Sequence, residues 1–210
     1  MSGARRRLAA ELRAKGITDE AVLQAIERTP RHLFVPSGVR HRAYEDAPLP
    51  IGNGQTISQP FVHARSLQLL ELTGAERVLE VGSGSGYQTV LLSHLAREVY
   101  SVERIDALAR SAADVVHAAG ARNVHIECRD GTAGWPEHAP FDAIVVGAGS
   151  PDVPKPLMDQ LAEGGRLLTP VGDREQQRLV LVRRTGGRFA RQDYDPVRFV
   201  PLLGVHGWAE

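Results

Sequence analysis

A short apolar run that ends in three closely spaced glycines restricts this chain to few folds. Residues 78–87 read VLEVGSGSGY, and a helical pattern follows Gly82, Gly84 and Gly86 from about Tyr87 to Ala96. A strand that ends in a glycine-rich turn and continues as a helix is typical of a doubly wound α/β sheet, where glycines let a ligand approach the backbone. The stretch therefore predicts an open sheet with a ligand site at the carboxyl ends of its strands.

The rest of the chain continues this alternation of strand and helix. Short apolar runs are expected to form strands over residues 77–81, 98–103, 124–128, 141–146 and 165–169. Strands that alternate with helices imply a mostly parallel sheet covered on both faces. Two further strands, over 178–184 and 199–203, have no clear helix between them. We therefore expect a Rossmann-like α/β fold with an antiparallel carboxyl-terminal edge.

The amino-terminal part of the chain reads as helical. Two helices are expected in residues 1–30, the second of them capped by Thr18 and ended by Pro30. A third helix is expected from Phe61 to Leu72, closed by Gly74. These helices are an elaboration ahead of the sheet.

Between these helices the chain is rich in proline and glycine from 31 to 60, and it is expected to be mostly loop. Its last part, PIGNGQTISQP at 50–60, is polar and predicts neither a helix nor a regular strand. We expect residues 1–72 to form a helical and substrate-loop region. Residues 73–210 should form a ligand-binding core with the carboxyl-terminal strands, and the two parts should make one structural unit.

Composition excludes several classes of protein. Apolar residues make up 42% and charged residues 24%, which is ordinary for a globular protein. With 25 basic and 25 acidic residues, the chain lacks the basic excess of a nucleic-acid-binding surface. No segment has the length of a signal peptide core or of a membrane span, so a cytoplasmic protein with no membrane partner is expected.

Cysteine and histidine, which commonly bind metals, are not spaced to form a metal site in this sequence. A single cysteine, Cys128, excludes an internal disulfide and a cysteine-based zinc site, and it is expected to be a small core residue. The eight histidines show no metal-ligand spacing, and we expect no metal.

Acidic residues near the ends of three successive strands narrow the choice of ligand. Glu80 lies two residues ahead of Gly82, Glu103 ends the second strand and Asp130 follows the third. A carboxylate at Glu80 suits an amine-bearing ligand better than a pyrophosphate, one at Glu103 can bind ribose hydroxyls, and one at Asp130 can meet an adenine amine. The G-x-G-x-G spacing also differs from the dinucleotide fingerprint, which disfavours a nicotinamide dehydrogenase. Together, the three acidic residues and the glycine spacing indicate S-adenosylmethionine as the ligand and a class I methyltransferase as the fold.

Motifs outside the glycine loop point to one family. They include PR at 30–31, FVP at 34–36, AY at 43–44, LPIG at 49–52, GQTISQP at 54–60, PFDAIVVGA at 140–148 and LAEGGRLLTPVG at 161–172. From about residue 30 to Gly204 the chain resembles protein-L-isoaspartate O-methyltransferase, and GQTISQP is the most specific of these motifs.

The resemblance implies roles for individual residues. Ser58 matches the active-site serine, and Thr56 and Ser58 would bind the substrate in a loop that closes over the methyl donor. The residues expected to contact S-adenosyl-L-methionine, or its product S-adenosyl-L-homocysteine, are Thr56, Ile57, His63, Glu80, Gly82, Ser83, Gly84, Gly86, Glu103, Asp130 and Gly131.

The implied activity is repair of damaged protein. The methyl group would pass to the α-carboxyl of L-isoaspartyl residues in flexible peptides and unfolded protein segments. A carboxylate with a pKa near 4 is already a nucleophile at neutral pH, so no general base is needed. We therefore expect Ser58 to position this carboxylate rather than to attack, and we expect the enzyme to be a monomer.

Two departures from the family pattern concern the pocket. Arg129 stands where the family usually has glycine, and Gly149 lies in a loop, GAGSPDVP, that is commonly richer in alanine. Two alternatives remain open: a related methyltransferase acting on a biosynthetic peptide or small-molecule carboxylate, and a non-catalytic module that senses S-adenosylmethionine.

Overall fold

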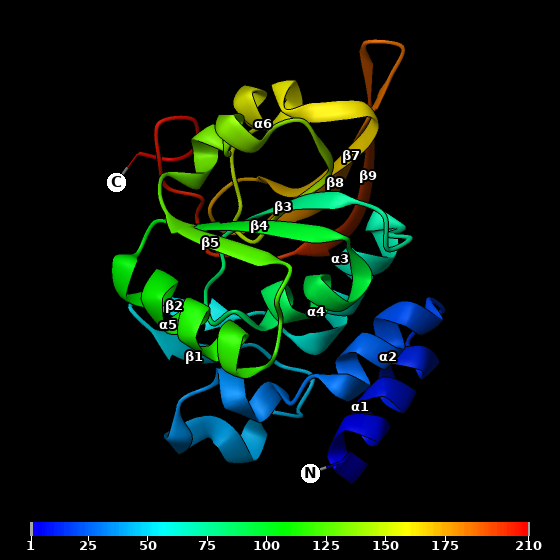
Figure 1. Cartoon of the computed structure of the whole chain (residues 1–210), viewed down its shortest axis with the longest axis vertical. Helices are drawn as coiled ribbons and strands as arrows, with labels where there is room; N and C mark the ends of the chain where they lie inside the picture. The colour runs from blue at the N-terminus through cyan, green and yellow to red at the C-terminus, as the bar shows by residue number, and fades with distance from the viewer. Residues whose placement is uncertain (1, 210) are drawn as a thin grey trace.

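The computed structural model describes residues 2–209, and a seven-stranded sheet forms the centre of this part of the chain (Figure 1). The strand order is β5-β4-β3-β6-β7-β8-β9. Strands β3 to β7 pair in parallel, whereas β8 and β9 are antiparallel. The strands are β3 Arg77–Val81, β4 Glu98–Glu103, β5 Val124–Cys128, β6 Phe141–Val146, β7 Leu161–Gly172, β8 Gln177–Thr185 and β9 Arg188–Val197. The predicted doubly wound sheet with an antiparallel edge is confirmed.

Helices cover both faces of this sheet. The α-helices are α1 Ser2–Ala14, α2 Glu20–Arg28, α3 Pro60–Leu70, α4 Tyr87–Leu95, α5 Asp106–Ala118 and α6 Lys155–Asp159. The short 3₁₀ helices are η1 Arg31–Phe34, η2 Ser37–Arg42, η3 Gly131–Ala133 and η4 Pro136–His138. In Figure 1, α3, α4 and α5 lie on one side of the sheet and α6 on the other, with α1 and α2 beyond α4. No helix in the part of the chain described here is long and apolar enough to cross a membrane.

Side chains that alternate along the strands build two separate cores. Val78 of β3 packs with apolar residues of α1 to α4, whereas Leu79 and Val81 pack on the opposite face with Leu157 of α6. Successive residues of a strand point to opposite faces, so one short strand contributes to both cores. This alternation also decides where the acidic residue of β3 points.

The polar segment ahead of α3 is a β-hairpin, and the expectation of an irregular loop is wrong. Strand β1 Leu49–Gly52 pairs antiparallel with β2 Gln55–Ile57. Asn53 and Gly54 have positive φ angles of 51° and 69°, which glycine and asparagine adopt most readily in tight hairpin turns. Leu49 and Ile57 face each other and are buried, so the hairpin is anchored by apolar contacts and leaves its polar side chains available.

Two helix ends differ from the expectation. Asp19, not Thr18, caps α2: its side chain accepts hydrogen bonds from the backbone nitrogens of Ala21 and Val22. Helix α3 ends at Glu71, which is left-handed with a φ angle of 49°, and not at a glycine. Both differences are local, and neither moves a strand.

Both edges of the sheet also differ from the expectation. The last strand is β9, which follows Gly186 and Gly187, whereas 199–203 forms no strand of the sheet. A two-glycine turn between paired strands is a strong hairpin signal, and the polar composition of β9 concealed it. Cys128 of the opposite edge strand β5 is exposed rather than a core residue.

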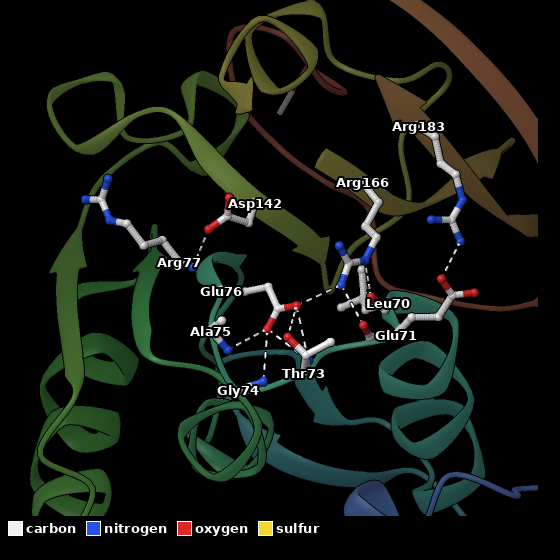
Figure 2. A network of polar contacts seen from close by, with 10 residues as sticks. All are labelled: Leu70, Glu71, Thr73, Gly74, Ala75, Glu76, Arg77, Asp142, Arg166 and Arg183. Atoms are coloured by element: carbon white, nitrogen blue, oxygen red, sulfur yellow. Dashed lines mark hydrogen bonds and ion pairs between the residues drawn. The ribbon is translucent and has the colours of Figure 1, made fainter. Parts of the chain in front are cut away.

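A buried carboxylate ties the sheet to α3 at the end opposite the glycine loop (Figure 2). Glu76 is 6% exposed and accepts hydrogen bonds from backbone nitrogens of 73–75 and from Arg166 Nη2 at 3.1 Å. Burial alone would raise the pKa of Glu76, but these bonds lower it. Arg166 of β7 also donates to the carbonyl oxygens of Leu70 and Glu71 at the end of α3. Helix and sheet are therefore joined by polar contacts there.

Candidate active site

Two adjoining cavities lie at the carboxyl ends of the central strands. One contains Glu103 in its wall, and we call it the Glu103 cavity. The other contains Ser58, and we call it the Ser58 cavity. Residues of the hairpin, the glycine loop and the end of β6 line both cavities: Thr56, Gly82, Gly84 and Gly147. The common wall allows one ligand to extend between the cavities.

The glycine loop adopts a backbone that side chains would disturb. Gly82, Gly84 and Gly86 all have positive φ angles, of 95°, 52° and 82°. A Cβ atom at Gly86 would lie 2.9 Å from a methyl group of Val116. The loop therefore requires glycine for its conformation and, at Gly86, for its packing on α5. Gly82 and Gly84 line both cavities, whereas Gly86 lines neither, so its predicted contact with the cofactor stays a prediction.

Glu103 lies where the sequence predicted a ribose-binding carboxylate. It is 7% exposed, and its two oxygens accept hydrogen bonds from the backbone nitrogens of Gly84 and Ile105, each at 3.0 Å. An ionised carboxylate has about four acceptor positions, so both oxygens retain capacity for ligand hydroxyls. Glu103 is thus held rigidly while it faces the cavity.

Glu80 lies beneath the loop and lines neither cavity. Its side chain is fully buried and accepts hydrogen bonds from Gln88 Nε2 at 3.1 Å and from the hydroxyls of Thr89 and Ser101 at 2.5 Å. Burial raises the pKa of Glu80 to about 7, against the effect of these bonds. Alternation along β3 turns Glu80 toward α4, so direct contact with the ligand stays a prediction, and the carboxylate is placed to tie α4 to the sheet.

Asp130 faces the carboxyl-terminal segment, whereas its neighbour Gly131 lines the Glu103 cavity. One oxygen of Asp130 accepts hydrogen bonds from the backbone nitrogen and hydroxyl of Thr132, and the other accepts from the backbone nitrogen of Val205 at 3.0 Å. Burial raises the pKa of Asp130, but these hydrogen bonds outweigh it and the pKa is lowered. A contact with adenine stays a prediction for Asp130, and Gly131 is the better placed of the two.

Arg31 supports the hairpin from behind, and sequence reasoning did not assign it a role. Its guanidinium is fully buried, and Nη2 donates to the carbonyl oxygens of Ser58 at 3.0 Å and Ala47 at 3.3 Å. The group also lies 5.4 Å from the centre of the Tyr87 ring. Burial lowers the pKa of Arg31, but an arginine remains charged. Arg31 therefore fixes the backbone at Ser58 while the half-buried Ser58 side chain faces the cavity.

His63 presents an unpartnered acceptor or donor to the Ser58 cavity. Its ring is 8% exposed, and Nδ1 lies 3.0 Å from Gln88 Oε1. Nε2 is buried and has no hydrogen-bond partner among the described residues, nor has the hydroxyl of Tyr87 beside it. Burial lowers the pKa of His63 to about 4, so the ring is neutral at physiological pH. Buried polar atoms without partners indicate a place for a polar ligand, and they fit the amino-acid part of the expected methyl donor.

Other residues of the two cavities were not singled out from the sequence. Those of the Glu103 cavity include Gln55, Val81, Ile105, Ala148 and residues 200–203. Those of the Ser58 cavity include Ser66, Tyr87, Gln88 and Phe199. Ala148 follows β6 closely, and its place near a strand end could have indicated it. Nothing in the sequence pattern marks 199–203 as a cavity wall. The described residues contain no group of three or more His, Cys, Asp or Glu placed to hold a metal ion.

Comparison with known sequences decides the family. A family described as protein-L-isoaspartate(D-aspartate) O-methyltransferase matches residues 4–207 of the 210 in this chain. The chain belongs to this family. Its predicted membership is confirmed over almost the whole length.

Curated members of the protein-L-isoaspartate O-methyltransferase family are similar over about nine tenths of their length. The enzyme of that name from Desulfotalea psychrophila is 52% identical over 195 residues, which are 93% of this chain and 91% of the relative. Protein-L-isoaspartate O-methyltransferase 2 of Pelobacter propionicus is 52% identical over 200 residues, covering 94% of this chain and 89% of the relative.

Solved structures of the family share the fold. A protein-L-isoaspartate O-methyltransferase aligns with a TM-score of 0.88 at 30% identity, covering 97% of this chain and 67% of the other. A β-aspartate methyltransferase from Plasmodium falciparum, in complex with S-adenosyl-L-homocysteine, aligns with a TM-score of 0.84 at 28% identity, covering 95% and 98%. The predicted class I methyltransferase fold is confirmed.

The two departures from the family pattern lie outside both cavities. Arg129 pairs with Glu137 at 3.1 Å, and its guanidinium lies 5.3 Å from the Trp135 ring centre. Gly149 exchanges backbone hydrogen bonds with 200–202, and a Cβ atom there would lie 2.9 Å from the Gln177 side chain. Arg129 thus packs away from the site, and Gly149 allows the carboxyl-terminal segment to approach.

Proposed function

We propose that this chain transfers the methyl group of S-adenosyl-L-methionine to the α-carboxyl of L-isoaspartyl residues in damaged proteins and peptides, and releases S-adenosyl-L-homocysteine. One observation carries the proposal beyond family membership. The Ser58 cavity and the Glu103 cavity share the wall formed by Thr56, Gly82, Gly84 and Gly147. A donor held along the glycine loop and a carboxylate held at the hairpin would therefore meet at this wall.

The residues of the Glu103 cavity support binding of the adenosine part. Glu103 would accept hydrogen bonds from the ribose hydroxyls, and the backbone at Gly131 would border the adenine. The glycine loop, with Gly82, Ser83, Gly84 and Gly86, would follow the ligand toward His63 in the Ser58 cavity. When bound, S-adenosylmethionine supplies a methyl group already activated on a sulfonium.

The residues of the Ser58 cavity support orientation rather than proton transfer. The substrate carboxylate, with a pKa near 4, is ionised at neutral pH and needs no base. The hydroxyls of Thr56 and Ser58 can hold this carboxylate, while Arg31 fixes the Ser58 backbone and directs its own charge to carbonyl oxygens. Orienting the reacting groups can lower a barrier by about 7–11 kcal/mol in favourable cases. A strong ion pair is not needed, because both reacting charges disappear in the transfer.

The proposal includes the partners and the location. The substrates would be flexible or unfolded segments, because a residue held in a folded partner could not reach the Ser58 cavity beside the hairpin. A net charge of zero supports the absence of a nucleic-acid partner. We also propose a cytoplasmic monomer, with residues 1–72 and 73–210 acting as one structural unit.

The deciding experiment uses two peptides that differ only in isoaspartate or aspartate at one position. Methyl transfer from labelled S-adenosylmethionine to the isoaspartyl peptide alone, reduced at least about tenfold in Ser58→Ala, is the expected result. Transfer to neither peptide, with normal donor binding by calorimetry, would reject the repair activity. It would then favour a biosynthetic peptide or small-molecule carboxylate as substrate, or a non-catalytic sensor.

A further inference from the structure

Three buried side chains beside the Ser58 cavity form one row of hydrogen bonds, which we call the Glu80–Gln88–His63 relay. Gln88 Nε2 lies 3.1 Å from Glu80 Oε1, and Gln88 Oε1 lies 3.0 Å from His63 Nδ1. Glu80 is 0% exposed, and Gln88 and His63 are each 8% exposed. Gln88 and His63 line the cavity, whereas Glu80 lies behind them. The relay thus connects the sheet to the wall that a ligand would touch.

The direction of this relay follows from its acidic end. Glu80 also receives the hydroxyls of Thr89 and Ser101, each at 2.5 Å, so all three of its polar neighbours donate to it. The Gln88 amide nitrogen, which can only donate, is the atom that faces Glu80 Oε1. Its oxygen then faces His63 Nδ1, which must carry the ring proton. Nε2 is left as an unprotonated acceptor.

The free acceptor points to a particular kind of ligand group. His63 Nε2 is buried and has no partner among the described residues. Beyond the ribose at Glu103, the rest of the methyl donor would pass Gly82 and Gly84 into the Ser58 cavity. The amino-acid tail of S-adenosylmethionine has one hydrogen-bond donor, its ammonium group. A hydrogen bond between a neutral acceptor and an ammonium is charge-assisted, and a neutral ring does not repel it.

We propose that Gln88 is a positioning residue for methyl transfer: it holds His63 with its proton on Nδ1, so that Nε2 can accept a hydrogen bond from the ammonium group of the donor. The proposal rests on the proposed function, because the ligand is the donor assigned there. Gln88 acts through His63 and contacts no reacting atom. The orientation of a hydrogen bond on one ring nitrogen commonly sets the state of the other in this way.

The first test needs no activity. Nitrogen-15 spectra of histidine-labelled protein distinguish a protonated ring nitrogen from an unprotonated one, and the His63 signals are those lost in His63→Gln. We expect Nδ1 protonated and Nε2 unprotonated in the unliganded protein. In Gln88→Met the acceptor at Nδ1 is lost, and we expect the Nε2-protonated form to appear. In Gln88→Glu one carboxyl oxygen replaces the amide oxygen at Nδ1, while the other meets Glu80 and must carry a proton to replace the donor there. The original form of His63 should then return.

The second test separates positioning from general damage. We expect Gln88→Met to raise the Kd for S-adenosylmethionine by about tenfold or more, as for a lost hydrogen bond to a charged group. Its KM for the isoaspartyl peptide should change by less than about threefold, the ordinary scale of indirect effects. Thr89→Val is the matched control, because Thr89 is fully buried on the same helix and its hydroxyl donates to Glu80, whereas the hydrogen bond of the His63 ring is to Gln88. It should lower stability but leave the His63 spectrum and donor affinity unchanged.

The outcomes decide the proposal independently of the repair activity. A wild-type His63 with its proton on Nε2 would overturn it, whatever the fate of the Gln88 variants. An unchanged spectrum and an unchanged donor Kd in Gln88→Met would also overturn it. A rise confined to the peptide KM would reject the ammonium as the partner. Failure to methylate isoaspartyl peptide, with normal donor binding, would reject the proposed function and leave the relay standing.

Discussion

Replacement of Glu80 by glutamine should change how the stability of the protein depends on pH. Burial raises the pKa of Glu80 from an ordinary 4.5 to about 7. Between these values Glu80 holds a proton in the folded protein that it has released in the unfolded chain. The contribution of Glu80 to stability is therefore greatest below about pH 4.5 and is lost as pH rises through 7. At about 1.4 kcal/mol for each tenfold change in proton affinity, the loss approaches about 3 kcal/mol. Glu80→Gln has no proton to release and lacks this loss.

Urea unfolding of the wild type and Glu80→Gln, from pH 4.5 to 8.5, measures the effect. Subtracting the two free energies of unfolding removes the contributions of the other titrating groups. As pH rises over this range, the wild type should lose about 3 kcal/mol of stability relative to Glu80→Gln. Glu76→Gln provides a control of opposite sign. The pKa of Glu76 is lowered in the fold, so its contribution is present at neutral pH and lost on acidification. A pH-independent difference for Glu80→Gln would refute the reasoning.

Three further predictions concern the site. Gly86→Ala should lower the free energy of unfolding by about 2 kcal/mol or more, because of its φ angle of 82° and a 2.9 Å contact with Val116. In the control Gly38→Ala the new methyl meets nothing within 4 Å, and the free energy of unfolding should change by less than about 0.5 kcal/mol. Equal losses for Gly86→Ala and Gly38→Ala in urea unfolding would contradict this reasoning. Arg31→Met removes the donor to the Ser58 carbonyl and should lower kcat about tenfold in the peptide assay, whereas an unchanged kcat would exclude a role for Arg31. Glu103→Gln should weaken binding of S-adenosyl-L-homocysteine about tenfold by calorimetry, and unaltered binding would exclude the ribose contact.

The central sheet and the glycine loop could be predicted because their signals are local. Apolar runs of strand length alternate with helical patterns, and the closely spaced glycines of 82–86 indicate a turn with positive φ angles. Glu103 could be placed for the same reason, since the end of a parallel strand faces the site wherever the strand lies. These predictions needed the order of the elements and little knowledge of their packing.

The remaining features depend on contacts between distant segments. Nothing adjacent to Arg31 in sequence indicates that its guanidinium reaches Ser58, and Gln88 gains its meaning only from His63 and Glu80. The side of β3 toward which Glu80 points could have been derived from alternation, but the ligand-based argument favoured the cavity. The hairpin at 49–57 was missed because its turn residues were counted as evidence for a loop.

Helix α3 has a consequence for how the chain can change in length. It begins at Pro60, two residues after Ser58, and the carbonyls at its other end bind Arg166 of the sheet. One residue inserted into α3 would lengthen it by about 1.5 Å and rotate one end by about 100°. Because the far end is held by Arg166 and Glu76, the displacement would fall on the hairpin that carries Ser58. Insertions in this family should therefore be accepted at exposed turns such as 186–187 and excluded from α3.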